Sequence, residues 1–141
     1  MIYTLDTNVL VDALRQPAEL DRLKAFLSWA LPSTVLSSVV LAELTAGART
    51  AKVREALEQQ FLAPFERRGR ILAPSAAAWR RAAAVLRATT AAPSANRLND
   101  VLLACEARES GWTIVTRGAD FSAIRRAVTG LKIAVPFPAR P

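Results

Sequence analysis

Four acidic residues, far apart in the sequence, are the side chains best suited to catalysis in this chain: Asp6, Glu43, Asp100 and Asp120. Each also has an ordinary structural explanation, as a helix cap, as the partner of an arginine, or as a solvated loop residue. The stronger argument is convergence, because four carboxylates at one edge of a sheet repel one another unless a divalent cation neutralises them. We therefore expect a carboxylate site that takes a hard, oxygen-preferring cation, Mg²⁺ or Mn²⁺.

The amino-acid composition excludes several other kinds of site. The chain has no histidine, and its one cysteine is Cys105. Serine and cysteine nucleophiles that need a histidine base are therefore excluded, as are the usual His/Cys zinc sites. A single cysteine also leaves no intramolecular disulfide, so we expect a reducing, cytoplasmic environment. The longest uncharged run, residues 25–42, contains Pro32 and several hydroxyl side chains, so we expect no membrane span.

Size and charge predict one basic globular domain. The 141 residues are 52% hydrophobic, which favours a single compact domain over residues 1–141. Nineteen Lys and Arg against twelve Asp and Glu give a net charge of +7. Arginine binds phosphate through two parallel hydrogen bonds, so an arginine-rich surface favours ligands that carry phosphate. An Ala- and Arg-rich composition is also typical of GC-rich genomes, which offers a second explanation for the arginines.

Short apolar runs alternate with longer helical patterns along the chain. The runs predict strands at 2–5, 34–37, 71–72, 112–116 and 133–135. Two predicted helices begin at caps: one follows residues 6–8 and runs to about residue 14, and one follows Ser38 and covers 39–46. Three more are predicted at 20–31, where Pro32 ends the helix, at 53–65 and at 75–90. The last begins at Asn99 or Asp100 and runs through residue 105. Trp79, Ala83 and Leu86 share one face of the helix at 75–90, and a loop is expected at 91–95. With right-handed crossovers, this alternation predicts an α/β fold with a central, mostly parallel sheet of four to five strands.

The acids occupy suggestive places in these elements. Ligands of open α/β sheets bind at the carboxyl ends of the strands, where Asp6 and Asp120 follow the first and fourth predicted strands. Asp100 is expected in the first turn of an apolar helix, and Glu43 lies among apolar neighbours, where a lone charge costs several kcal/mol.

The segments that carry these acids resemble the motifs of PIN domains. The matching segments read LDTNVL at 5–10, SSVVLAEL at 37–44 and NDVLLA at 99–104. The segment IVTR at 114–117, followed by Asp120 and Phe121, resembles the fourth motif. The resemblance covers nearly the whole chain, and its length and motif spelling are closest to the VapC-type ribonuclease toxins of bacterial toxin–antitoxin pairs.

This resemblance implies a three-layer α/β/α fold and Mg²⁺- or Mn²⁺-dependent cleavage of single-stranded RNA. Carried over by motif, the principal acids are Asp6, Glu43 and Asp100, of which Asp6 and Asp100 are the expected metal ligands; Thr116 helps to position the site, and Asn8 and Asn99 lie near it. The sequence departs from the family at Gly118, where many relatives carry Asp or Asn. Either Asp120 supplies the fourth carboxylate or the site works with three.

Partners follow from the same resemblance. RNA is the implied substrate, and Arg97 and Arg117, beside two of the motifs, are candidates for its phosphates, with surface ion pairs as the alternative. A cognate antitoxin that covers an apolar groove is implied, as is a homodimer or a toxin–antitoxin hetero-oligomer. Apolar residues within 20–31 or 53–65 could form such surfaces or belong to the core.

Two other functions remain open from the sequence. The chain could be a basic RNA- or protein-binding module in which Gly118 marks a disabled site. A dehalogenase-like phosphatase also places an Asp after its first strand, but it needs a second acid where this chain has Asn8.

Overall fold

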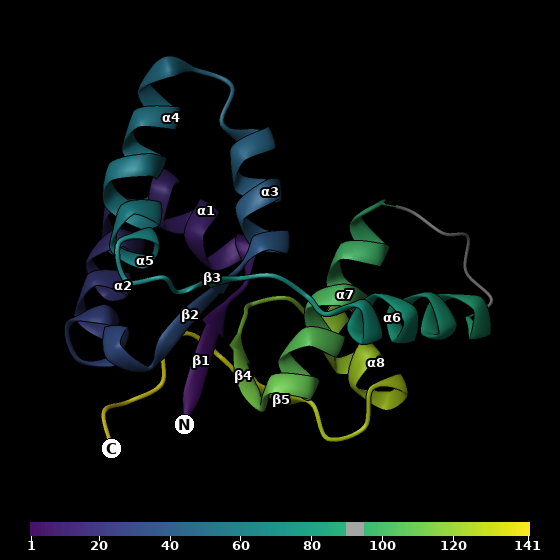
Figure 1. The fold of residues 1–141 in the computed structure, drawn as a ribbon. Helices are drawn as coiled ribbons and strands as arrows, with labels where there is room; N and C mark the ends of the chain where they lie inside the picture. Colours follow the sequence, from purple (N-terminus) through teal and green to yellow (C-terminus); the bar gives the residue numbers. More distant parts are fainter. Residues whose placement is uncertain (90–94) are drawn as a thin grey trace.

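The protein folds around a five-stranded sheet in the computed structural model, which describes residues 1–89 and 95–141 (Figure 1). Its strands are β1 (Ile2–Leu5), β2 (Thr34–Ser37), β3 (Ile71–Leu72), β4 (Trp112–Val115) and β5 (Lys132–Ala134). They lie in the order β3-β2-β1-β4-β5, and every neighbouring pair is parallel. The predicted α/β fold with a parallel sheet of four to five strands is confirmed.

Helices pack on both sides of this sheet. They are α1 (Thr7–Arg15), α2 (Pro17–Ala30), α3 (Ser38–Gly47), α4 (Ala51–Ala56), α5 (Ala63–Glu66), α6 (Ala76–Ala88), α7 (Ala95–Ser110) and α8 (Asp120–Ala127). Figure 1 shows α1, α2, α4 and α5 on one side of the strands and α6, α7 and α8 on the other. No helix of the described ranges has the length and apolar character needed to cross a bilayer.

The order of the strands creates a switch point beside β1. From β1 the chain adds β2 and β3 on one side, and it then crosses over to add β4 and β5 on the other. Two hydrogen bonds extend the ladders past the strand ends: the Asp6 N–H donates to the Val115 carbonyl, and the Thr116 N–H to the Ala134 carbonyl, both at 3.0 Å. Such a reversal leaves a crevice at the carboxyl ends of the strands, where Asp6 and Thr116 are the first residues after β1 and β4.

The strands and the helix that flank this crevice form the most buried part of the protein. Strand β4 is buried along its whole length, as expected for a parallel strand covered on both faces. In α7, all residues from Val101 to Ala107 are buried, including Glu106, as occurs in a helix that is packed on all sides. The residues at the carboxyl ends of β1 and β4, Asp6 and Thr116, are therefore attached to a rigid support.

Several helix boundaries differ from the prediction. Ser37 rather than Ser38 caps α3, with its Oγ accepting the Val39 N–H at 3.1 Å. The predicted helix over 53–65 is divided into α4, a π-helical turn (Leu57–Leu62) and α5. Pro64 follows this turn and has no N–H for a regular helical bond, which explains why one α-helix does not continue through it.

The elements around two of the acids also differ. Helix α7 begins at Ala95, so Asp100 lies in its second turn and not at its start. The predicted loop at 91–95 falls outside the described residues except for Ala95, which is helical. Helix α8 was not predicted, and Asp120 is its first residue rather than a loop residue.

Helix α6 is buried mainly through small residues. Ser75 caps it by accepting the Ala78 N–H at 3.0 Å. The buried residues are Ala78 and Ala82, whereas Trp79 is half exposed and Ala83 is exposed. Since alanine occupies both faces, hydrophobic periodicity could not select the inward one.

Candidate active site

A cleft of about 470 Å³ opens at the switch point, and it brings the four predicted acids together. Its lining includes Asp6 after β1, Glu43 from α3, Asp100 from α7 and Asp120 at the start of α8. The same wall contains Thr7, Asn8, Asp12, Arg15 and Gly118. Four carboxylates separated by up to 114 positions in the chain therefore face one solvent-filled space.

Asp6 is the most tightly held of these acids. It is buried, and one carboxylate oxygen accepts the Thr7 N–H while the other accepts the Thr116 hydroxyl, each at 2.8 Å. Burial raises its pKa above the ordinary value; the two hydrogen bonds oppose this, and the charges of Glu43 and Asp120 add to it. The Asp6 carboxylate is thus fixed in direction but would be stabilised by a positive charge.

Thr116 is itself oriented by its neighbours. Its Oγ1 accepts the Asn8 side-chain amide at 3.2 Å and the Gly118 N–H at 2.9 Å, which leaves its own proton for Asp6. A Cβ at Gly118 would lie 3.3 Å from both Asn8 Nδ2 and Thr116 Oγ1. The glycine therefore allows this close packing, and Asp120, two residues later, lines the cleft.

Asp100 is the acid most affected by the others. It is partly buried, and burial together with the charges of Asp6, Glu43 and Asp120 raises its pKa to about 7. Glu43 is held by the Thr7 hydroxyl, which donates to Oε1 at 2.9 Å. The carboxylates are close enough to raise one another's energy, and a cation would relieve this repulsion.

The donor set fits a hard divalent cation in its chemistry, because carboxylate oxygens are the ligands that Mg²⁺ and Mn²⁺ prefer. Within the described residues, no three acidic or other ligating side chains are already grouped to hold an ion. Asp6 and Asp100 are the two candidates whose raised pKa values most favour a positive neighbour.

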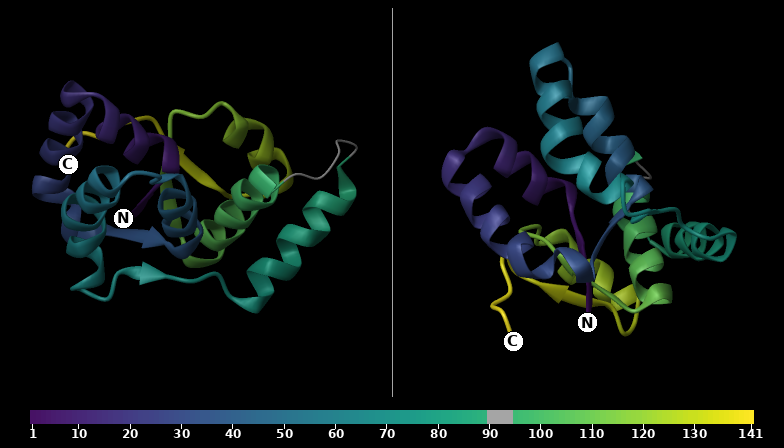
Figure 2. Two further views of the ribbon diagram at one scale, coloured as in Figure 1. Left: turned by 90° about the horizontal axis from the view of Figure 1, so that it is seen from above. Right: turned by 60° about the vertical axis from the view of Figure 1, so that its left-hand side comes forward.

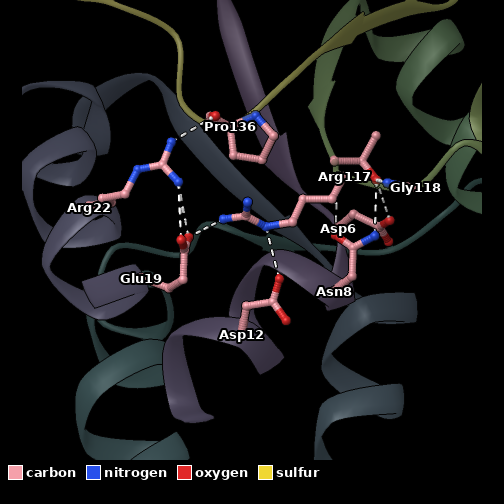
Figure 3. A network of polar contacts seen from close by, with 9 residues as sticks. Asp6, Asn8, Asp12, Glu19, Arg22, Arg117, Gly118 and Pro136 are labelled. Carbon is pink, nitrogen blue, oxygen red and sulfur yellow. Dashed lines mark hydrogen bonds and ion pairs between the residues drawn. The ribbon is translucent and has the colours of Figure 1, made fainter. Parts of the chain in front are cut away.

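Arg117 joins an ion-pair network with Asp12 and Glu19 (Figure 3). Its Nε lies 2.8 Å from Asp12 Oδ2, and its Nη2 contacts Glu19. Glu19 also pairs with Arg22 at 3.1 Å, and Arg22 donates to the Pro136 carbonyl at 3.0 Å. The loop that carries Thr116 is thereby linked to α1, α2 and the C-terminal segment.

The other predicted site residues lie at the margin. Asn99 and Arg97 belong to α7 beside Asp100, but neither is among the described residues that line the cleft. Sequence reasoning missed Thr7, Asp12 and Arg15. The helical spacing of Asn8, Asp12 and Arg15 was the available signal, because it places them along one side of α1.

Replacing Arg117 tests whether this network holds the loop. Arg117→Ala leaves Asp12 and Glu19 without their shared cation, so we expect about 1 kcal/mol of lost stability, or roughly 3 °C in Tm. If the cleft is catalytic, its turnover rate should also fall severalfold, because the loop that carries Thr116 is no longer held by these ion pairs. Thermal unfolding measures the first effect, with Arg125→Ala on the exposed side of α8 as control. Equal Tm values for both variants would show that the ion pairs contribute nothing.

Comparisons with known proteins agree on the family and the fold. The model of the PIN domain matches residues 3–127. The crystal structure of FitAcB from Neisseria gonorrhoeae is similar at a TM-score of 0.69 and 26% identity, over 96% of this chain and 98% of that chain. The structure of VapBC2 from Rickettsia felis, bound to a promoter DNA fragment, has a TM-score of 0.67 and 24% identity, over 96% of this chain and 98% of that chain. The structure of DNA-bound VapBC from Salmonella typhimurium has a TM-score of 0.70 and 19% identity, over 97% of this chain and 99% of that chain. Comparison with curated proteins gave no match.

Proposed function

The chain belongs to the PIN domain family, and on this basis we propose that it is a metal-dependent ribonuclease that cleaves single-stranded RNA and is the toxin of a toxin–antitoxin pair. The observation that most supports this proposal is the convergence of Asp6, Glu43, Asp100 and Asp120 on one cleft. Burial, together with repulsion from Asp6, Glu43 and Asp120, raises the pKa of Asp100 to about 7, so a positive charge nearby would stabilise its ionised form. A scissile phosphate group would add further negative charge, so we infer that a divalent cation binds here.

Each residue of the cleft has a role in this proposal. Asp6 and Asp100 would hold a Mg²⁺ or Mn²⁺ ion, which supplies charge neutralisation and polarises the phosphodiester. The Thr116 hydroxyl donates to Asp6 and keeps its carboxylate directed into the cleft, and the Thr7 hydroxyl holds the Glu43 carboxylate in the same way. Glu43 then completes the ligand set or orients the attacking water. Asp120, exposed at the mouth, is the fourth carboxylate in place of the residue missing at Gly118.

The antitoxin has a suitable groove beside the cleft. A groove of about 250 Å³ is lined by apolar residues of α1, α3, α4 and the residue that caps the end of α3: Val11, Leu14, Leu44, Val53 and Ala48. Arg15 and Glu43 line both the groove and the cleft, so a segment seated in the groove would adjoin the acids. Because the similar FitAcB and VapBC structures are toxin–antitoxin complexes, we assign this groove to a cognate antitoxin, in a homodimer or a larger toxin–antitoxin assembly.

The phosphatase alternative gains no support from the site. Phosphoaspartate chemistry needs a proton donor two residues after the first Asp. At that position, the Asn8 amide donates to Thr116 Oγ1, and its carbonyl oxygen accepts the Arg117 N–H at 3.4 Å. Asn8 therefore has a structural role and cannot act as a general acid.

Metal removal is the direct test of the proposed activity. Purified protein incubated with a labelled single-stranded RNA should cleave it in Mg²⁺ or Mn²⁺, stop in EDTA and recover when metal is restored. Asp21→Asn, an exposed acid of α2 outside the cleft, is the matched control and should cleave normally. Undiminished cleavage in EDTA would contradict the metal-dependent mechanism. An absence of cleavage in every metal would favour the binding-module alternative.

A further inference from the structure

Helix α6 has a broad face that no other described element covers. Only Ala78 and Ala82 are buried on this helix, which packs on α7. Trp79, with 50% of its surface exposed, is the most exposed aromatic residue of the described chain. Figures 1 and 2 show α6 running along the flank of the molecule beside α7, apart from α1 and α3.

Arginines surround this tryptophan, and the helix carries no acidic residue. Arg80 and Arg87 are exposed, and with Trp79 and Ala83 they follow the three- and four-residue spacing of a single helix face. Within the described residues, no carboxylate lies within ion-pair distance of Arg80 or Arg87, in contrast to Arg22 and Arg117. The side chains of Trp79, Arg80, Ala83 and Arg87 are called the α6 face below.

The charge of the α6 face indicates the kind of partner that fits it. A second copy that docked the same face in a symmetric dimer would bring arginines against arginines with no acid between them, which is unfavourable. A polyanion meets no such penalty. The exposed indole ring adds a flat surface on which a base can stack, and aromatic side chains among arginines are how many proteins hold single-stranded nucleic acid without reading its sequence.

We propose that the α6 face is an accessory binding surface for single-stranded RNA, with Trp79 stacking on a base and Arg80 and Arg87 contacting phosphates. It shares no residue with the lining of the acidic cleft. This inference rests on the proposed function, since it assumes that RNA is the ligand. The face would hold a part of the substrate that lies away from the bond being cut, and it would lower KM more than it raises kcat.

Binding can be measured apart from cleavage. The probe is a short, fluorescently labelled oligoadenylate in EDTA, so that affinity is read without hydrolysis. We expect Trp79→Ala to weaken binding about tenfold, the effect of losing one stacked base. The double variant Arg80→Ala/Arg87→Ala should weaken it similarly and reduce the slope of log affinity against log salt by roughly 1.4.

Two controls separate this surface from general charge and from misfolding. Arg125→Ala/Arg126→Ala removes the same charge from α8, which lies across α7 from α6 (Figure 2), and affinity should stay within about twofold. Trp79→Phe keeps an aromatic ring and should keep most of the affinity. Of the three tryptophans, Trp112 is buried and Trp29 is partly buried. RNA should therefore quench the tryptophan fluorescence of the wild type through Trp79, and Trp79→Phe should abolish this quenching.

Three outcomes would overturn the proposal: unchanged affinity in Trp79→Ala and in the α6 double variant, equal losses in the α6 and α8 double variants, or loss of self-association in place of RNA affinity in sedimentation experiments. The last would assign the face to a protein interface. Binding through Trp79 without any cleavage in Mg²⁺ would leave this inference standing and remove the proposed ribonuclease function.

Discussion

Asp100→Asn is expected to lower RNA cleavage roughly a thousandfold and, in the absence of metal, to make the protein more stable. The activity is expected to fall because the variant loses a carboxylate that lines the cleft and that we propose as a metal ligand. The stability rises because the variant also removes one of four converging negative charges, and that charge is partly buried. A purely structural residue would show both effects in the same direction.

The measurement is a pair of curves for each protein. Initial cleavage rates in Mg²⁺ and thermal unfolding in EDTA at pH 8 are compared for wild type, Asp100→Asn and Asp21→Asn. Magnesium should raise the Tm of wild type, because a ligand of the folded state stabilises it by mass action, and it should raise that of Asp100→Asn much less. A variant that cleaves at the wild-type rate, or that unfolds at a lower temperature in EDTA, would remove Asp100 from the site.

Glu106→Gln is expected to stabilise the protein by about 2 kcal/mol at pH 8 and hardly at all near pH 4.5. Glu106 lies on α7 with 3% of its surface exposed. Burial is the main cause that raises its pKa to about 7, and the nearby Ser37 side chain lowers it only in part. In the described part of the chain, neither carboxylate oxygen has a hydrogen bond of ordinary geometry.

The direction with pH follows from this raised pKa. Below the unfolded value of 4.5, the carboxyl group is protonated in both states and costs little. As the pH rises through about 7, the unfolded chain gains by ionising while the folded protein resists it, so wild-type stability is lost across this interval. The neutral amide of glutamine does not titrate, and the advantage of the variant should grow over the same range.

Chemical denaturation at several pH values between 4.5 and 8 measures the difference. The exposed Glu58→Gln is the matched control and should follow wild type. If Glu106→Gln is instead destabilised equally at every pH, the carboxylate makes a contact that the fold needs.

The strands and the acids that follow them could be predicted because a strand that is buried on both faces of the sheet appears in the sequence as a short apolar run. Runs such as residues 2–5 and 112–115 are apolar because parallel strands are covered on both sides, and polar residues begin where each strand reaches the rim. Asp6 and Asp120 stand out for this reason. The resemblance of the motifs then related them to Glu43 and Asp100, and the structure places all four in one cleft.

What could not be predicted depends on contacts between distant segments. The pairing of Arg117 with Asp12 and Glu19 requires α1, α2 and the loop after β4 to meet, and no local pattern contains that information. The outward position of Trp79 was hidden by an alanine-rich helix, in which both faces have similar hydrophobicity. The start of α7 at Ala95 was missed because Asn99 and Asp100 offered a competing capping signal in the sequence.

The tight packing around Gly118 makes this position sensitive to substitution. An acid introduced here would bring its Cβ to 3.3 Å from the Thr116 hydroxyl and from the Asn8 amide, so these side chains would have to shift by a few tenths of an ångström. The Thr116 hydroxyl donates to Asp6 and accepts from Asn8, so the shift would disturb the support of Asp6. An acid at position 120 lines the same cleft without entering this contact.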